Sequence, residues 1–167
     1  MTTGSDLNPA FAQVRFAGLR FTPLSVEDTV AALMARAPDA TFAAFVTPNA
    51  EHAFLRRRDA QFRRCGDTCW ISTNDSRVLG RAARLAGLDL KFAPGVYVVD
   101  QMFKTAISPN DSISIVGATP QIVADLVRQF GLTMVVQHIP PMGFINDPEA
   151  VARAVDFVVK NPARFVL

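Results

Sequence analysis

The chain has 167 residues, enough for one domain with a substantial hydrophobic core and few for two. Half of the residues are hydrophobic, which excludes a disordered chain, and the formal net charge of +2 is too small to indicate a nucleic-acid-binding protein. No uninterrupted apolar run is long enough to cross a bilayer, and the start "MTTGSDLNPA" lacks the basic and apolar regions of a signal peptide. We therefore expect a globular protein of the cytoplasm.

The supply of metal ligands is small. The two cysteines, Cys65 and Cys69, are spaced C-x3-C, and the two histidines are His52 and His138. A structural zinc site takes four ligands, and no second pair of cysteines or histidines at metal-ligand spacing exists. The sequence therefore predicts no metal site, no other cofactor and no disulfide framework, which agrees with a reducing compartment.

The N-terminal part predicts a loose segment followed by a hairpin. Residues 1–13 are mostly polar, and we expect the folded domain to span residues 14–167. The stretch "QVRFAGLRFTPLS" alternates around Gly18, which is typical of a small β-hairpin with Phe16 and Phe21 as apolar anchors.

A helix, a strand and a second helix are predicted next. Ser25 begins the first helix, with Asp28 three residues on as in a capping box. The continuous apolar run at 41–47 is typical of a strand that is covered on both faces. The second helix opens with Pro48 near its first turn and continues through the arginine-rich stretch that follows.

That arginine-rich helix has two readings. At helical spacing, four arginines gather on the side opposite its apolar residues: Arg56, Arg57, Arg63 and Arg64. They form either an ordinary solvated face or a surface that faces anionic lipid. Arg58 falls on the apolar side.

Strands and helices alternate through the rest of the chain. This order predicts a Rossmann-like α/β fold with a parallel sheet and helices on both faces, behind the small N-terminal hairpin. The strands at 41–46, 112–116, 132–136 and 164–167 are expected in one sheet. The remaining predicted elements are a strand at 69–72 and helices at 76–86, from Gly95, at 119–130 and at 147–160.

Ligands of parallel sheets bind at the carboxyl ends of the strands, so the strand-to-helix junctions are the candidate sites. The first junction is Thr47-Pro48-Asn49. A hydroxyl and an amide at a helix N-terminus can hold a substrate hydroxyl or a phosphate. Alternatively, Thr47 is an ordinary N-cap.

The second junction is Asn74-Asp75-Ser76-Arg77. Asp75 is a candidate general base and Arg77 a candidate phosphate partner. The alternative is that Asp75 or Ser76 caps the following helix and that Arg77 is solvated.

Two further junctions lie in the C-terminal half. In "IVGATP" (115–120), a single glycine after a strand lets a ligand approach the backbone, and the next helix N-terminus favours negative charge. The pattern is neither G-x-G-x-x-G nor a P-loop. The loop "HIPPMGF" (138–144) is either a rigid ligand loop or a plain proline-rich connection, with His138 at the end of a strand.

Four segments, in this order, resemble the WecG/TagA/CpsF family of bacterial glycosyltransferases. They are "FVTPNAEH" (45–52), "NDSRVLGRAARLAGL" (74–88), "ISIVGAT" (113–119) and "PPMGFINDP" (140–148). The resemblance extends from about residue 14 to the end of the chain, and the forms of these segments look most like the branch found with exopolysaccharide gene clusters.

The resemblance implies an inverting, metal-independent transferase. Such enzymes move a hexose or an N-acetylhexosamine from a UDP-sugar to a polyprenyl-diphosphate-linked sugar in exopolysaccharide or cell-surface polysaccharide synthesis. The implied partners are this donor and this acceptor, and no nucleic acid is expected. The resemblance also implies peripheral contact with the inner face of the cytoplasmic membrane. An oligomer is compatible with it.

The resemblance also implies residue roles at the first two junctions. The family's catalytic aspartate matches Asp75, a threonine beside it matches Thr47, and Asn49 lies close by. Arg77 stays the candidate phosphate partner near this aspartate.

In the C-terminal half, the resemblance implies that the matched residues bind substrate. Gly117 and Ala118 match the nucleotide-side loop, and the backbone N–H groups through Thr119 are expected to face the departing UDP. Gly143 and Phe144 match an aromatic-containing loop after the next strand.

The sequence departs from the family pattern in several places. Many members have Asp-Gly where this chain has Asp75-Ser76, and the family's G-x-D-L is Gly95-Val96-Tyr97-Val98 here. A Gly-x-Pro-x-Gln-Glu segment and a basic C-terminal region, both usual in the family, are not found. With the apolar end "RFVL", this leads us to expect the N-terminal two-thirds of a longer enzyme.

Two alternatives to catalysis remain open from the sequence. A Rossmann-type nucleotide-binding module would share the same fold and junctions without transferring a sugar. An inactive truncated fragment would not bind UDP at all.

Overall fold

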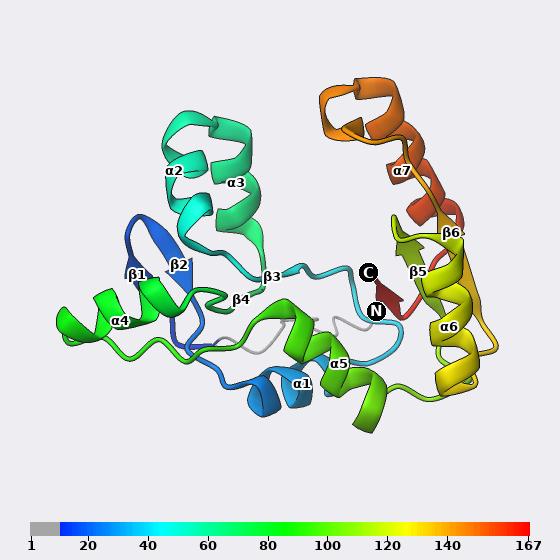
Figure 1. Cartoon of the computed structure of the whole chain (residues 1–167), viewed down its shortest axis with the longest axis horizontal. Helices are drawn as coiled ribbons and strands as arrows, with labels where there is room; N and C mark the ends of the chain where they lie inside the picture. The colour runs from blue at the N-terminus through cyan, green and yellow to red at the C-terminus, as the bar shows by residue number, and fades with distance from the viewer. Residues whose placement is uncertain (1–10) are drawn as a thin grey trace, which may run out of the picture. The chain divides into compact units, whose positions relative to one another are not determined.

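The computed structural model describes residues 11–167, which form two compact units (Figure 1). The first unit ends at Ala106, and the second comprises Ile107–Leu167. Most of the predicted loose segment 1–13 lies outside the described residues. None of the helices described between residues 11 and 167 is long and apolar enough to cross a membrane.

The first unit combines four strands with the helices α1 to α5 (Figure 1). Its strands are β1 (Val14–Phe16), β2 (Leu19–Phe21), β3 (Phe45–Val46) and β4 (Ile71–Ser72). Its helices are α1 (Val26–Met34), α2 (Ala50–Arg58), α3 (Ala60–Thr68), α4 (Arg77–Leu85) and α5 (Gly95–Thr105).

The predicted N-terminal hairpin is present. Strands β1 and β2 pair antiparallel, and the two turn residues Ala17 and Gly18 both have positive φ, 49° and 79°. Such two-residue turns match the right-handed twist of the strands that they connect. Leu19 and Phe21 are buried and cluster with Leu79 of α4, so the hairpin covers one side of this helix.

Strands β3 and β4 form a short parallel pair in which Phe45 lies beside Ile71 and Val46 beside Ser72. The hairpin is attached to this pair through Thr22. Its N–H donates to the carbonyl of Ser72 (2.6 Å), and its hydroxyl accepts from the N–H of Ser72 (3.1 Å). Because both groups of Ser72 are satisfied by one residue, the position of β4 against the hairpin is fixed.

The single helix predicted from Pro48 through the arginines is two helices, α2 and α3. The break is at Asp59, which ends α2 and is the N-cap of α3. Its side chain accepts from the N–H groups of Gln61 (2.8 Å) and Phe62 (2.9 Å). Aspartate competes for backbone donors in this way, so an internal Asp can restart a helix. Pro48 precedes the N-cap Asn49 and is not in the first turn.

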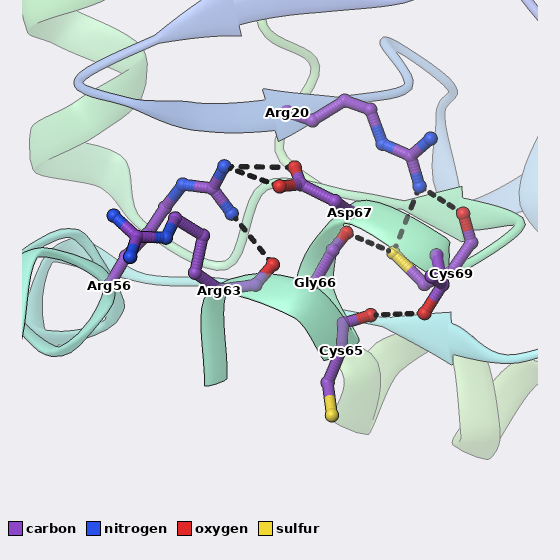
Figure 2. A network of polar contacts seen from close by, with 8 residues as sticks. Arg20, Arg56, Arg63, Cys65, Gly66, Asp67 and Cys69 are labelled. Atoms are coloured by element: carbon purple, nitrogen blue, oxygen red, sulfur yellow. Dashed lines mark hydrogen bonds and ion pairs between the residues drawn. The ribbon is translucent and has the colours of Figure 1, made fainter. Parts of the chain in front are cut away.

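Arg56 has a structural role, contrary to the expectation of a solvated side chain (Figure 2). Its guanidinium binds both carboxylate oxygens of Asp67 at 2.8 Å and donates to the carbonyl of Arg63 at 3.1 Å. A bidentate pair of this kind holds α2 against α3. Arg58, expected on the apolar side, is exposed.

Next to this pair, the C-terminal end of α3 is joined to the hairpin (Figure 2). The Cys69 thiol donates to the carbonyl of Gly66 at 2.9 Å, and the Arg20 guanidinium from β2 contacts both the sulfur and the carbonyl of Cys69. Cys69 is buried and Cys65 exposed, and both are free thiols.

The second unit is a three-stranded parallel sheet with helices beside it. Its strands are β5 (Ile113–Val116), β6 (Val135–His138) and β7 (Phe165–Val166), in the order β6-β5-β7. Its helices are α6 (Pro120–Phe130), the 3-10 turn η1 (Phe144–Asn146) and α7 (Pro148–Lys160). The predicted helices at 119–130 and 147–160 are present: Thr119 is the N-cap of α6, Gly131 ends it with φ 63°, and Asp147 is the N-cap of α7.

The α/β class with parallel strands, flanking helices and an N-terminal hairpin is confirmed. The prediction of one sheet is wrong, because β3 is hydrogen-bonded to β4 in a separate pair while β5, β6 and β7 share a sheet. The predicted strand 41–47 is shortened to two residues, and Phe42 is 79% exposed. The strand predicted at 132–136 begins three residues later and ends two residues later, at Val135–His138.

An ion pair anchors β7 to the loop before β5. The Arg164 guanidinium donates to the Asp111 carboxylate at 2.7 Å, with 24% and 10% of the two side chains exposed. Burial raises the pKa of the Asp111 carboxyl, but hydrogen bonds from the Ser108 N–H and from Arg164 outweigh it and hold this pKa below the usual value for aspartate.

We predict that Asp111→Asn lowers the free energy of unfolding at neutral pH by about 1.5–3 kcal/mol, the value of hydrogen bonds to a charged group. Because the folded-state pKa is depressed, this contribution exists above the unfolded pKa of about 3.9 and is lost as the pH falls through the folded pKa. When urea unfolding is measured from pH 7 to pH 2, the free energies of unfolding of the wild type and of Asp111→Asn should therefore become equal at acid pH.

The matched control is Asp156→Asn. This exposed carboxylate pairs with Lys160 at 3.0 Å across one helical turn, an interaction worth about 0.2–0.5 kcal/mol. A difference between wild type and Asp111→Asn that stays constant with pH would contradict the prediction.

Candidate active site

The carboxyl end of β4 is held by neighbouring segments on two sides. The N–H of Thr73 donates to the carbonyl of Val46 (3.0 Å), and its hydroxyl donates to the carbonyl of Ala93 (2.7 Å). The Asp75 N–H donates to the carbonyl of Pro48 (3.1 Å). The segment after β3 and the segment before α5 therefore meet at the end of β4, all within the first unit.

Asp75 is not the cap of α4. The N-cap is Ser76, whose hydroxyl accepts from the N–H of Leu79 at 3.2 Å. The side chain of Asn74 accepts from the N–H of Ser76 at 3.0 Å. The half-buried Asp75 carboxylate makes no hydrogen bond or ion pair with any residue in 11–167. Ser76 therefore supplies the cap, one of the two capping residues that the sequence offered, and the Asp75 carboxylate takes no part in it.

Thr47 lies at the neighbouring junction, directly after β3. It packs against Gly95 at the start of α5, where a Cβ would come within 3.0 Å of the Thr47 hydroxyl oxygen and 3.2 Å of its methyl group. Thr47 is not an N-cap, since that position of α2 is Asn49. Because β3 and β4 are parallel neighbours, the Thr47 and Asp75 junctions lie at the same edge of the pair.

Asn49 is the cap of α2. Its side-chain oxygen accepts from the N–H groups of Glu51 (3.0 Å) and His52 (3.3 Å), and the imidazole of His52 accepts from the N–H of Asn49 (2.9 Å). This reciprocal capping box uses the amide oxygen of Asn49 and leaves its NH2 group free of any role in the cap. His52 also stacks on Phe62 of α3, with ring centroids 5.4 Å apart.

Arg77, the predicted phosphate partner, is the exposed first residue of α4. Its guanidinium lies over the ring of Phe92, 5.1 Å from the ring centroid. A cation over an aromatic face gains about 0.5–1 kcal/mol at an exposed site, which orients the guanidinium without neutralising it.

In the second unit, the turn after β5 has an unusual backbone. Gly117 has φ 103° and Ala118 has φ 57°, a region that residues with a Cβ rarely adopt. The Gln137 side chain donates to the carbonyls of both residues, at 3.0 and 3.3 Å, and the N–H of Gly117 donates to the carbonyl of His138 at 2.8 Å. β6 therefore holds the turn in this strained form.

The same turn leads into α6 with unused donors. The Thr119 hydroxyl accepts from the N–H of Ile122 at 3.3 Å, and Pro120 has no N–H. The N–H groups of Ala118 and Thr119 donate to no acceptor in the described part of the chain. Free amides before a helix N-terminus favour an anion.

The loop after β6 contains Gly143 and Phe144. Gly143 has φ 75° and precedes η1, and the N–H of Phe144 donates to the carbonyl of Pro141 at 3.1 Å. Phe144 is half-buried. Because β5 and β6 are parallel neighbours, this loop and the Gly117 turn leave the sheet at the same edge.

The candidate site residues predicted from the sequence thus gather in two groups, one in each unit. The sequence predicted no role for three supporting side chains: Thr73, Asn74, which was named only as part of the second junction, and Gln137. Thr73 and Asn74 flank the end of a buried strand, and polar residues there were a usable signal. Gln137 gave none, since its bonds are to a distant turn. In residues 11–167, no three His, Cys, Asp or Glu side chains lie close enough to hold a metal ion.

One family model, described as "Glycosyl transferase WecG/TagA/CpsF family", matches residues 14–167. The match begins with the first residue of β1 and includes every described strand and helix of both units. A search of curated protein sequences gives no match to the chain.

We predict that Gly95→Ala forces the Thr47 side chain to move, because the new Cβ would lie 3.0 Å from the hydroxyl oxygen. The substitution should therefore destabilise the protein by about 1–3 kcal/mol, although alanine is the better helix former. In a Thr47→Ala background both close atoms are gone, and the same substitution should be neutral or stabilising.

A double-mutant cycle measured by urea unfolding gives the coupling between the two positions, expected at about 0.5–3 kcal/mol. Additive effects of the two substitutions would show that Thr47 and Gly95 do not touch.

Proposed function

The chain belongs to the WecG/TagA/CpsF family of glycosyltransferases, and we propose that it is an inverting enzyme in which Asp75 is the general base. It moves a hexose or an N-acetylhexosamine from a UDP-sugar to a polyprenyl-diphosphate-linked sugar during exopolysaccharide or cell-surface polysaccharide synthesis. The observation that supports this role of Asp75 is its free carboxylate at the carboxyl end of β4, with the cap of α4 supplied by Ser76.

The proposed reaction is a single displacement. Asp75 takes the proton of the acceptor hydroxyl, whose oxygen forms a bond to the anomeric carbon of the donor sugar. The bond from this carbon to the diphosphate oxygen breaks on the opposite face, and UDP leaves with the electron pair. One displacement inverts the anomeric configuration. Thr47 and the amide of Asn49, at the neighbouring junction, are proposed to position the acceptor.

The donor side is proposed to use the second unit. Gly117, Ala118 and Thr119 precede α6, and the two free N–H groups of this turn suit the negative charge of a departing diphosphate. Gly143 and Phe144 follow the neighbouring strand and are proposed to contact the nucleotide, with the Phe144 ring as a stacking surface.

We also propose peripheral contact with the membrane that holds the lipid-linked acceptor. Phe54 and Leu55 of α2 are 64% and 41% exposed, and Arg57 and Arg58 on the same helix are exposed as well. Exposed apolar side chains beside cations are the features of surfaces that bind anionic lipid.

The test of this function is Asp75→Asn. This change keeps the shape of the side chain and removes the proton acceptor, so sugar transfer should slow by about 10²–10⁴-fold, the usual contribution of a positioned base. UDP affinity by calorimetry and the midpoint of thermal unfolding should change little. Transfer is measured with UDP-sugars and a lipid-diphosphate sugar acceptor.

The matched control is Ser76→Ala, next to Asp75. Loss of this cap should cost about 0.5–2 kcal/mol of stability and leave the transfer rate within a few-fold of wild type. If Asp75→Asn transfers sugar at the wild-type rate, Asp75 is not the base. A wild-type chain that binds UDP without any transfer would instead favour a nucleotide-binding module.

A further inference from the structure

A pocket of about 390 Å³ lies beside α4 in the first unit. This volume falls in the range of about 300–1,000 Å³ that is usual for small-molecule sites. Residues of α4 and the segment before α5 line it, and the lining includes Asn74 but not Asp75. The pocket is therefore not formed by the carboxylate proposed as the catalytic base.

The lining of this pocket is strongly basic. Arg77, Arg81 and Arg84 come from α4 at spacings of four and three residues, which place them on one face of the helix. Lys91 is the fourth cation. The one carboxylate in this lining is Asp89, which pairs with Lys91 at 2.6 Å. The hydrogen bond from Lys91 and, to a smaller extent, the nearby charge of Arg84 lower the pKa of Asp89, while Arg77 and Arg81 have no carboxylate partner in the lining.

The arginines have few competing partners. Arg81 and Arg84 make no ion pair with any residue described between 11 and 167, and Arg77 lies over the Phe92 ring without a carboxylate partner. Exposed guanidinium groups at one pocket suit a ligand with several oxygen acceptors, because each guanidinium offers a fork of N–H donors.

A buried amide in the lining also lacks a partner. Asn74 is 2% exposed, and its side-chain oxygen accepts from the N–H of Ser76 at 3.0 Å, which fixes the orientation of the amide. Its Nδ2 has no acceptor among the described residues. This nitrogen faces Gly80, another lining residue, where a Cβ would lie 3.2 Å away. An unpaired buried donor is costly, and an acceptor in the pocket would satisfy it.

We propose that this pocket binds a phosphate-bearing anion, a phosphate monoester or a diphosphate, through Arg77, Arg81, Arg84 and the Nδ2 of Asn74. Such a group carries about two negative charges and three or more acceptor oxygens, which matches three cations and one amide donor. A single carboxylate has too few oxygens for these donors. This assignment does not depend on the proposed sugar transfer.

The probe that tests it is inorganic pyrophosphate, titrated into the whole chain by calorimetry at low salt. Its binding should weaken as salt is added, because the arginines are exposed. In parallel, the side-chain amide resonance of Asn74 should shift in nitrogen–proton correlation spectra. Phosphatidylcholine vesicles with and without phosphatidic acid form a second arm, which tells a lipid phosphate from a soluble one.

The double variant Arg81→Gln/Arg84→Gln should weaken binding by about 10–100-fold, through loss of two charge-assisted hydrogen-bonding groups. The control is Arg128→Gln/Arg153→Gln in the second unit. It removes the same two charges from exposed sites and should bind like the wild type.

Each outcome decides the assignment. Pyrophosphate binding that is lost in the α4 double variant alone supports a soluble phosphate ligand. Binding only to phosphatidic acid vesicles, lost in the same variant alone, supports a lipid phosphate. Absence of binding in both arms, an equal loss in the two double variants, or an Asn74 resonance that does not respond overturns the proposal.

Discussion

The fixed backbone at the end of β4 is the constraint on which the first unit depends. Ser72 is tied to the hairpin through Thr22, Thr73 to β3 and to the segment before α5, and Asp75 to the segment after β3. The Ala93 N–H also donates to the carbonyl of Asn74, so residues 72–75 are all held, by the hairpin, by the region of β3 and by the segment before α5. A short pair such as β3 and β4 could not define this edge alone, since each strand has only two residues.

The same strand end serves two different purposes. Asn74 is still paired in parallel with Phe92, and its side chain is buried beneath α4. Asp75 has left the strand and is half-buried, and its carboxylate has no partner among residues 11–167. Gly80 leaves room for the first arrangement, because a Cβ there would lie 3.2 Å from the Nδ2 of Asn74. The proposed base and the proposed anion pocket are therefore neighbours in sequence with separate side-chain surroundings.

Local signals in the sequence predicted the helix ends well. Ser25 and Asp147 cap the helices predicted to start there, and Gly131 ends α6, because each of these signals acts within one helical turn. Predictions that depended on distant partners succeeded only in part: β5, β6 and β7 share a parallel sheet as expected, but other long-range features differ. Sheet membership of β3, the start of β6 and the pairing of Arg56 with Asp67 are set by residues far along the chain, and periodicity carries no information about them.

In the candidate site, too, local sequence signals do not decide the roles of single residues. Asn74, Asp75 and Ser76 are all good capping residues, so their local preferences could not decide which one caps α4. The decision comes from non-local bonds: Ala93 donates to the carbonyl of Asn74, and Asp75 donates to the carbonyl of Pro48. With the backbone fixed in this way, the side chain of Ser76 accepts a hydrogen bond from the N–H of Leu79, and the side chain of Asn74 accepts one from the N–H of Ser76. Ser76 therefore caps α4 without the Asp75 carboxylate, which accepts no hydrogen bond from any residue in 11–167.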